Sequence, residues 1–250
     1  MTLQEYFDKN QKFALAFSGG TDSAFLLYAA LRAGCDVRPY FMRTQLQPRF
    51  ELEDAERLCH KLGVSLTVLM IDAANCREIA ENGRDRCYHC KRLLFERLTE
   101  RAKSDGYTLV VDGTNASDKA DDRPGMLALS ELNVKSPLRE CGVTKSDVRR
   151  LSRETGLFTA DKPSYACLAT RIRTGENITS EKLNKIEAAE SELTEMGFSD
   201  LRIRISQNRA TLQLPAGQHE RAKREWPFIS AAITKYFSEA ELDQNSRQET

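Results

Sequence analysis

One short stretch near the N-terminus constrains the fold more than any other. An apolar run, Phe13 to Phe17, stops at Ser18-Gly19-Gly20, and a helix-forming run begins directly after it. This is the pattern of a β-strand, a glycine turn and a helix N-terminus. The N–H groups of a first helical turn lack partners in the helix and, with the helix dipole, favour an anion. The glycines let a phosphate approach the main chain. Ser18 and Ser23 add hydroxyl donors, and Asp22 can hold a metal ion or cap the helix.

The six residues Ser18-Gly19-Gly20-Thr21-Asp22-Ser23 resemble the PP-loop of the ATP-pyrophosphatase superfamily, which splits ATP into AMP and pyrophosphate. The stretch is not a Walker A loop, because the Gly-Lys-Ser/Thr ending is missing, and it is not GxGxxG. An ordinary strand-to-helix turn is the alternative, and a Gly-Gly pair alone would support no more than that. The full match, placed between a strand and a helix, favours nucleotide binding.

Composition narrows the class of protein. The 250 residues suit one large domain or a standard domain with a smaller partner. Lys plus Arg equals Asp plus Glu at 37 each, so no global field recruits nucleic acid or a membrane. No apolar stretch approaches the length of a membrane span, and the first residues lack a signal peptide's basic and apolar regions. We expect a cytoplasmic homo-oligomer with a small-molecule nucleotide substrate, no membrane partner and no stable nucleic-acid partner.

Strands alternate with helices in the first half of the chain. The expected strands are 13–17, 37–42, 64–71 and 107–111, the third apolar enough to be buried; the expected helices are 22–33, 50–62 and 75–103, the last one broken near Gly83. This alternation predicts an α/β fold with a doubly wound parallel sheet. Ligands of such sheets lie beyond the carboxyl ends of the strands. Three stretches fall there and are expected to bind the nucleotide: Ser18 to Ser23, Arg43 with Thr44, and Gly113 to Asp118.

The remaining chain predicts a smaller unit. A polar loop at 116–125 and a charged helix at 144–155 precede a second loop at 161–171. That loop marks the boundary between a domain of residues 1–160 and one of residues 161–250. Beyond it we expect a long helix at 180–196, strands at 201–205 and 210–214, two helical segments and a frayed polar tail at 239–250. This order predicts a small C-terminal α+β unit.

A CxxC pair, Cys87 and Cys90, begins the helix expected after Gly83. A zinc ribbon would need a second CxxC, and a thioredoxin motif would follow the first strand of its sheet. A third cysteine, Cys167, lies in the boundary loop. Three thiols suit a [4Fe–4S] cluster with one iron open, and two thiols one helical turn apart with no ligand are the alternative. The other four cysteines are interpreted as structural: Cys35, Cys59, Cys76 and Cys141.

Two arginines share one face of the strand expected at 201–205. Arg202 and Arg204 alternate with apolar residues, so both guanidinium groups point to the same side. Such a pair can bind a phosphate or carboxylate bidentately, and a solvated edge strand is the alternative. Glu187 and Glu190 on the preceding helix either orient these arginines or face water.

These motifs resemble the LarE-type sulfur transferases, PP-loop enzymes that put sulfur into the nickel-pincer nucleotide cofactor of lactate racemase. The resemblance runs from Phe13 to about Leu214 and rests on Ala16-Phe17-Ser18-Gly19-Gly20-Thr21-Asp22-Ser23, Arg86-Cys87-Tyr88-His89-Cys90-Lys91, Gly113-Thr114-Asn115, Arg123-Pro124-Gly125, Lys162 to Arg171, and Arg202-Ile203-Arg204. It implies that Mg-ATP adenylates a carboxylate of pyridinium-3,5-biscarboxylic acid mononucleotide and that pyrophosphate leaves. Sulfur delivered at the cysteine position then displaces AMP and gives a thiocarboxylate.

The family has two sulfur chemistries. In single-cysteine members the cysteine gives up its own sulfur, becomes dehydroalanine and acts once. In three-cysteine members the thiols hold a [4Fe–4S] cluster that carries an extra sulfide. Because Cys87, Cys90 and Cys167 are all present, we favour the cluster, with Cys167 and Asp22 as catalytic residues.

The resemblance also places substrate-phosphate contacts on Arg202 and Arg204, with Arg171 and Glu190 nearby. The family's acidic residue after the second strand of this unit has no clear counterpart; Glu220 is the candidate.

Other functions fit the phosphate loop. A tRNA thiolase or an amidating ligase of the NAD-synthetase kind would keep the loop and change the acceptor. A nucleotide- or cluster-sensing binding protein would have no turnover. Neutral charge and the lack of an added RNA-binding domain count against tRNA. Release of pyrophosphate from ATP on addition of substrate distinguishes an enzyme from a binding protein.

Overall fold

The structure, a computed structural model, describes residues 1–118, 124–163 and 165–247. Arg123 and Ser164 of the motifs above, and the end of the expected tail, lie outside the described residues. The chain forms two compact units: the first holds Met1–Thr44, Arg49–Asp72 and Cys87–Lys162, and the second holds Gln45–Pro48, Ala73–Arg86 and Pro163–Thr250. Two early segments therefore belong to the second unit, together with the region that follows Lys162.

The first unit is built on a parallel sheet with the strand order β3-β2-β1-β4. Its strands are β1 (Lys12–Ala16), β2 (Asp36–Arg43), β3 (Thr67–Met70) and β4 (Val110–Val111). Leu15 of β1 lies in register with Pro39 on β2 and with Val111 on β4. Because β1 has a neighbour on each side, its residues from Phe13 to Ala16 are buried. The predicted parallel α/β sheet is confirmed.

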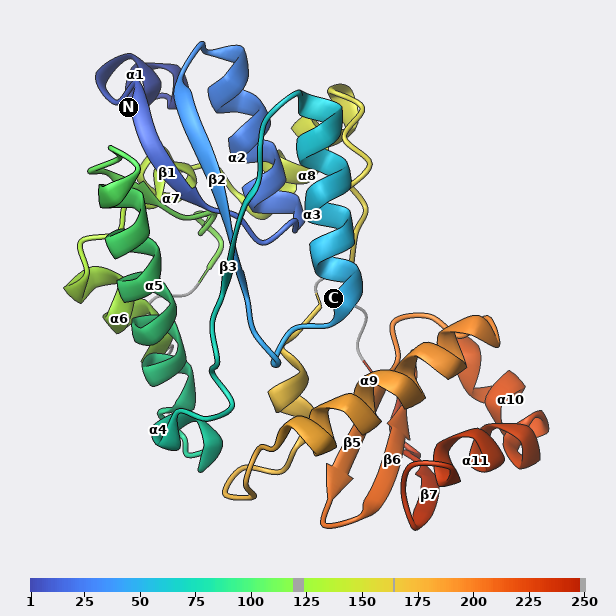
Figure 1. The fold of residues 1–250 in the computed structure, drawn as a ribbon. Helices are drawn as coiled ribbons and strands as arrows, with labels where there is room; N and C mark the ends of the chain where they lie inside the picture. The colour runs from blue at the N-terminus through green and yellow to red at the C-terminus, as the bar shows by residue number, and fades with distance from the viewer. Residues whose placement is uncertain (119–123, 164, 248–250) are drawn as a thin grey trace. The chain divides into compact units, whose positions relative to one another are not determined.

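Helices cover both faces of this sheet (Figure 1). They are α1 (Leu3–Lys9), α2 (Thr21–Arg32), α3 (Arg49–Leu62), α5 (Arg86–Ser104), α6 (Pro124–Glu131), α7 (Pro137–Glu140) and α8 (Lys145–Glu154). Phe13 of β1 shares a core with Leu27 of α2 and Leu58 of α3, whereas its neighbour Ala14 shares a core with Phe95 of α5. Successive strand residues point to opposite faces, so adjacent residues serve separate cores. In the part of the chain that the structure describes, no helix has the length and apolar character needed to cross a bilayer.

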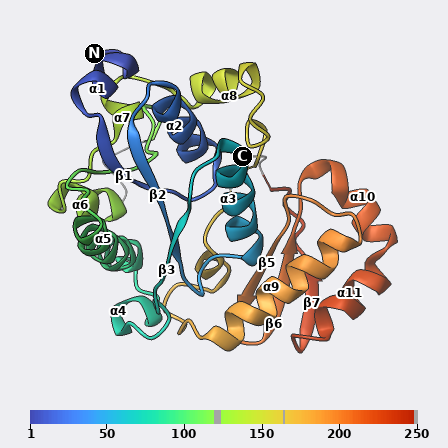
Figure 2. The same ribbon diagram turned by 45° about the horizontal axis from the view of Figure 1, so that its top comes forward.

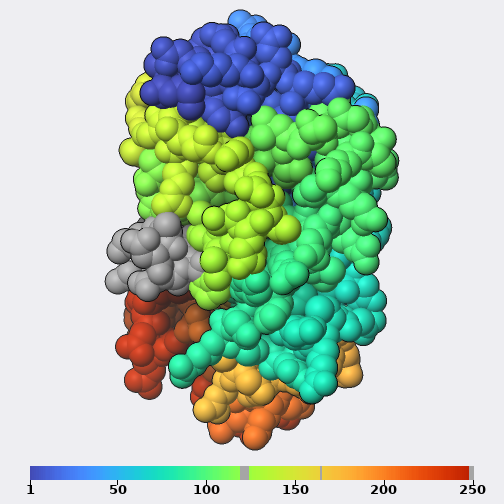
Figure 3. Space-filling view, turned by 90° about the vertical axis from the view of Figure 1, so that its left-hand side faces the viewer, coloured from blue at the N-terminus to red at the C-terminus, as the bar shows by residue number. Residues whose placement is uncertain are grey.

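The N-terminal helix packs beside α7. In Figure 3 the dark-blue N-terminal residues lie against segments coloured green to yellow, which come from later in the chain. The thiol of Cys141 donates a hydrogen bond to the carbonyl of Thr2 at 3.5 Å. The first residues are therefore ordered against the same unit that holds the phosphate loop.

The second unit contains a small mixed sheet in the order β5-β6-β7. Its elements are α4 (Arg77–Ala80), a 3-10 helix η1 (Leu168–Arg171), α9 (Ser180–Glu195), β5 (Arg202–Ser206), β6 (Arg209–Gln213), α10 (Ala216–Arg224), α11 (Trp226–Thr234) and β7 (Glu239–Leu242). β5 runs antiparallel to β6, and β7 runs parallel to it. α9 packs on β5, and α11 packs on α9 and β7 (Figure 2). This is the predicted small α+β unit.

Two expectations about the first unit are wrong. The strand expected to be buried over 64–71 is shorter, and it lies at the edge of the sheet, where Met70 is 79% exposed. An edge strand has one neighbour fewer, so an apolar sequence there is only partly covered. The loop expected to extend to residue 125 also ends earlier: Pro124 and Gly125 are the first residues of α6, where proline's fixed φ suits a helix start.

The expected frayed tail is wrong for its first residues, which form β7. Glu239 pairs with Arg209 at 2.8 Å, and Glu241 accepts a hydrogen bond from Thr211 at 2.6 Å. These cross-strand pairs and the backbone ladder to β6 order a segment whose polar composition indicates disorder. Pairing with a strand about thirty residues away is not visible in local sequence.

Candidate functional site

The phosphate loop joins β1 to α2 through a turn with two serine hydroxyls. Gly19 has φ of 68°, which glycine adopts without strain, and Gly20 is the N-cap of α2 with no side-chain cap. The Ser18 and Ser23 hydroxyl oxygens lie 3.1 Å apart, and the Ser18 hydroxyl accepts the N–H of Gly20 at 3.3 Å. With no side chain of the N-cap residue in the way, N–H groups of the first turn of α2 can meet phosphate oxygens.

Two glycines of the candidate site, Gly19 and Gly113, allow close packing of the main chain. A Cβ on Gly19 would lie 3.2 Å from the Glu51 carbonyl oxygen of α3. A Cβ on Gly113 would lie 2.9 Å from the main-chain nitrogen of Ser23. The segment after β4 therefore touches the first turn of α2, which explains the need for glycine in the Gly113-Thr114-Asn115 motif.

The Asp22 carboxylate is where three elements of the first unit meet. Its oxygens accept hydrogen bonds from Asn115 Nδ2 at 3.3 Å and from Lys145 Nζ at 2.7 Å. Asp118 in turn accepts the N–H of Asn115 at 3.1 Å, so it holds the loop rather than reaching Asp22. Asp22 is about a quarter exposed. A divalent cation could bind this carboxylate if it displaced the Lys145 ammonium.

The carboxyl ends of β2, β1 and β4 carry the three stretches that the sequence predicts for the nucleotide. Arg43 is the last residue of β2, and its carbonyl accepts the N–H of Ile71 at 2.9 Å. Since β1 lies between β2 and β4, Arg43 and Gly113 flank the phosphate loop at one edge of the sheet. The glycine cradle, the N–H groups and the carboxylate form a donor set that fits Mg-ATP.

Two lysines of this region escaped the sequence-based prediction. Lys145 is the first residue of α8 and pairs with Asp22. Lys162 donates to the Gly19 carbonyl at 3.4 Å and pairs with Asp54 of α3 at 2.7 Å. The only sequence feature that pointed to Lys162 was its place at the start of the motif Lys162 to Arg171. Lys145 follows an ordinary capping threonine, and nothing in its local sequence indicates a contact with the phosphate loop.

The second unit contains a pocket of about 570 Å³ rich in arginine. Four of its lining residues are arginines, four carry hydroxyl groups and two are isoleucines: Arg86, Arg171, Arg173, Arg204, Thr170, Thr174, Ser206, Thr211, Ile172 and Ile205. None of these lining residues is acidic. Among the four residues expected to contact a substrate phosphate, Arg171 and Arg204 line this pocket. Such an acid-free set of guanidinium groups suits an oxyanion.

Arg202 and Glu190, the other two predicted phosphate contacts, do not line this pocket. Arg202 shares a face of β5 with Arg204, and its pKa is lowered by burial and by the positive charges of Arg247, Arg171 and Arg204. This mutual repulsion is relieved when an anion binds among the guanidinium groups. Arg204 is exposed, and its Nε donates a hydrogen bond to the side-chain amide oxygen of Gln213 at 2.8 Å.

Glu190 is buried and forms an ion pair with buried Arg171. Arg171 Nε lies 2.9 Å from Glu190 Oε1, and Nη2 lies 3.3 Å from Oε2. The same carboxylate accepts the N–H of Ile203 at 2.9 Å and the hydroxyl of Tyr165. Arg171 Nη1 also donates to the Ala166 carbonyl at 2.7 Å. Glu190 thus orients Arg171, not the strand arginines, and ties the Cys167 loop to β5.

The three cysteines predicted as metal ligands lie in different units. Cys87 and Cys90 occupy the first turn of α5 at a spacing that places both on one helix face. Cys167 precedes η1 in the second unit. All are thiols rather than disulfides, which suits iron or zinc chemically. Over residues 1–118, 124–163 and 165–247, no group of three or more His, Cys, Asp or Glu side chains is gathered to hold a metal ion.

The remaining candidates have ordinary surroundings. Cys35 and Cys59 are buried, and burial raises the pKa of the Cys59 thiol to about 12, consistent with a structural role. Glu220, on α10, pairs with Lys223 at 2.7 Å. That lysine lowers the pKa of the Glu220 carboxyl, which is the wrong direction for a general acid.

Relatives of the chain fall into two groups. No family model matches it. It is 35% identical over 219 residues to an uncharacterized protein of Synechocystis sp., covering 86% of this chain and 81% of that one. It is 32% identical over 207 residues to the pyridinium-3,5-bisthiocarboxylic acid mononucleotide synthase of Lactiplantibacillus plantarum, covering 82% of this chain and 75% of the synthase.

A more distant similarity, 22% over 193 residues, links it to a tRNA-specific 2-thiouridylase of Thermotoga maritima and covers 60% of this chain. The first group covers both units, and its identity is well above that of the second. Together with the phosphate loop on a parallel sheet, this similarity shows that the chain belongs to the LarE-type sulfur transferases, enzymes of the PP-loop superfamily.

Proposed function

We propose that this protein is an ATP-dependent sulfur transferase that converts a carboxylate of pyridinium-3,5-biscarboxylic acid mononucleotide into a thiocarboxylate for nickel-pincer nucleotide synthesis. The observation that carries the proposal is the similarity to the Lactiplantibacillus plantarum synthase across 82% of the chain. The name of that relative supplies the product class. The arginine-rich pocket supports a substrate that bears a phosphate.

ATP would bind to the first unit. A carboxylate is a poor electrophile until one oxygen becomes a leaving group, and adenylation supplies that leaving group. The loop from Ser18 to Ser23 would hold the phosphates through its N–H and hydroxyl groups. Asp22 would hold Mg²⁺ once Lys145 has moved, and the freed ammonium would lie close enough to pair with a phosphate. We place the adenine near Arg43 and Gly113 at the flanking strand ends.

The mononucleotide would bind to the second unit. Arg202 and Arg204 would provide positive charge for its phosphate, and Arg171, which lines the pocket with Arg204, would add to it. The ion pair of Arg171 with Glu190 holds the carbonyl groups of the Cys167 loop, so the sulfur-delivering residue has a fixed main chain. In this proposal Glu190 acts through Arg171 and does not contact the substrate.

The test of the reaction is pyrophosphate release from Mg-ATP with the mononucleotide as acceptor. We expect release that depends on the mononucleotide, with formation of a thiocarboxylate detected by mass spectrometry when a sulfur source is present. Asp22→Ala should abolish release because the metal loses a carboxylate. Asp8→Ala, which changes an exposed carboxylate on α1, is the matched control. Pyrophosphate release with a tRNA transcript and not with the mononucleotide would favour a tRNA thiolase. Unchanged release by Asp22→Ala would contradict ATP binding at the loop from Ser18 to Ser23.

For the sulfur source, we propose that Cys87, Cys90 and Cys167 are ligands of a [4Fe–4S] cluster. Support comes from the CxxC pair at the start of α5 and from the third thiol, Cys167, in the unit proposed to bind the substrate. Anaerobic reconstitution should give roughly four irons per chain. Cys87→Ala should lose the iron and Cys76→Ala should keep it. If Cys87→Ala transfers sulfur once and its mass falls by that of one sulfur and two hydrogens, as conversion of a cysteine to dehydroalanine requires, the sacrificial chemistry operates instead.

A further inference from the structure

The pocket of the second unit contains a cation that the sequence patterns did not single out. Arg173 lines it together with Arg204, and the two come from separate segments. Two hydrogen bonds fix the main chain of Arg173: its N–H donates to the Ile205 carbonyl at 3.2 Å, and its carbonyl accepts a hydrogen bond from Asn82 Nδ2 at 2.9 Å. Ile205 directly follows Arg204 in β5, so the two arginines start from neighbouring, ordered backbone positions.

Two other arginines of the pocket are occupied by structural contacts. Arg171 is 1% exposed and is bound to Glu190. Arg86 donates to the Ala169 carbonyl at 3.2 Å and to the Asn82 side chain. Their positive charges still act on the pocket, but their donors are largely committed to protein acceptors. These two arginines therefore add positive charge to the pocket and stabilise its walls, but few of their donors can bind a ligand.

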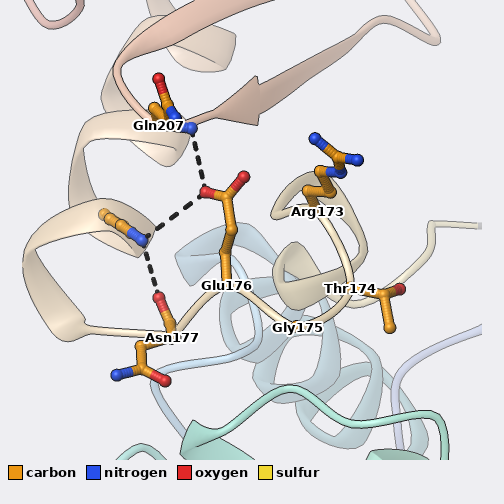
Figure 4. Close-up of a pocket in the computed structure, with 7 residues that line it drawn as sticks. Arg173, Thr174, Gly175, Glu176, Asn177 and Gln207 are labelled. Atoms are coloured by element: carbon orange, nitrogen blue, oxygen red, sulfur yellow. Dashed lines mark hydrogen bonds and ion pairs between the residues drawn. The ribbon is translucent and has the colours of Figure 1, made fainter.

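Arg173 differs from them in its side chain. It is exposed, and within the described residues no hydrogen bond or ion pair reaches its guanidinium group. The nearest acid on its own loop, Glu176, is already occupied. Glu176 accepts the Ser206 hydroxyl at 2.9 Å and the Gln207 N–H at 2.9 Å, and Figure 4 shows it turned toward Gln207 with Arg173 extended separately. The charge of Arg173 is therefore available to a ligand.

We propose that Arg173 is a binding residue for the substrate's phosphate monoester, which it and Arg204 hold from two sides of the pocket. This rests on the proposed function, in which the substrate is a mononucleotide. A phosphate monoester carries close to two negative charges near neutral pH, and two guanidinium groups match that charge and bind its oxygens bidentately. The pocket lining adds hydroxyl groups and no acidic side chain, so no negative charge of the lining repels an anion bound there. A carboxylate carries one charge and would use only one of the two guanidinium groups fully.

The binding test uses ribose 5-phosphate, which contains the phosphate and neither the pyridinium ring nor a carboxylate. Arg173→Met removes the charge and keeps most of the side-chain volume. We expect it to weaken binding of ribose 5-phosphate roughly tenfold or more in calorimetry, because a charge-assisted hydrogen bond is lost. Arg209→Met is the matched control: Arg209 is exposed on β6, pairs with Glu239 and does not line the pocket. It should bind within about twofold of the unaltered protein.

A second measurement uses the reaction itself. With the mononucleotide, Arg173→Met should raise KM by a similar factor, and with the corresponding nucleoside, which lacks the phosphate, the variant and the unaltered protein should be equally slow. Arg173→Lys should recover part of the binding, since the charge returns without the planar fork. Unaltered ribose 5-phosphate binding in Arg173→Met would overturn the proposal. If the mononucleotide is not an acceptor but Arg173 still governs ribose 5-phosphate binding, the proposed reaction fails and the phosphate ligand stands.

Discussion

The buried ion pair between Arg171 and Glu190 offers a test of how the second unit is held together. In Glu190→Gln, the volume is kept and one carboxylate oxygen becomes an NH₂ group. In the unaltered protein the two carboxylate oxygens accept four hydrogen bonds: Oε1 from Arg171 Nε and the Ile203 N–H, and Oε2 from Arg171 Nη2 and the Tyr165 hydroxyl. A glutamine has one oxygen, so two of these donors would face another donor. The guanidinium group, 1% exposed, would also lose its counter-charge.

Breaking a buried pair by removing one partner costs about 3–5 kcal/mol, and we expect that loss in the free energy of unfolding of the second unit. The chain's single tryptophan, Trp226, lies in α11 of this unit, so its fluorescence during urea denaturation reports the relevant transition. Glu181→Gln is the control, because it breaks an exposed pair with Lys185 on the same helix and should cost no more than about 1 kcal/mol.

The double variant Arg171→Met with Glu190→Gln separates charge from packing. With both charges gone, no uncompensated ion is buried, and part of the stability lost in Glu190→Gln should return. If Glu190→Gln lowers the free energy of unfolding no more than the exposed control does, the carboxylate does not balance a buried charge. The proposal that the Arg171–Glu190 pair holds the Cys167 loop is then wrong.

Three further outcomes follow from contacts and pKa shifts in the first unit. Gly113→Ala places a Cβ 2.9 Å from a main-chain nitrogen of α2 and should weaken ATP binding roughly tenfold. Gly217→Ala, where the added Cβ has open space, should leave ATP binding unchanged; equal ATP affinities of the two variants in calorimetry would contradict this. Burial raises the pKa of Cys59 to about 12, so iodoacetamide at mildly alkaline pH should modify exposed Cys87 and spare Cys59, as peptide mass spectrometry can show. Burial also raises the pKa of Tyr40 to about 12, so its contribution to stability is complete below pH 10 and is lost as the pH rises toward 12; Tyr40→Phe should flatten that decline, and an unchanged slope would refute it.

The sequence predicted local features well because their causes are local. The phosphate loop follows from glycine and serine between an apolar run and a helix, and the parallel sheet follows from alternating elements. What it missed depends on partners far along the chain. The pairing of Lys145 with Asp22, and of β7 with β6, joins segments that no periodicity relates. The pairing of Glu190 with Arg171 was not predicted for the same reason, since Arg171 lies in a loop whose path the sequence does not define.

Those long-range partners also bear on the order in which the chain can fold during synthesis. Asn82, fully buried with φ of 54°, bonds through its carbonyl to the Gly175 N–H and through its amide to the Arg173 carbonyl. The neighbouring Ala80 carbonyl accepts the Ile178 N–H. Residues 73–86 therefore leave the ribosome well before the segment that satisfies them, and must wait while the intervening first unit is made. A fragment cut at Pro163 would lack this wall of the arginine pocket, so the second unit is not a C-terminal module that can be moved between proteins by a single junction.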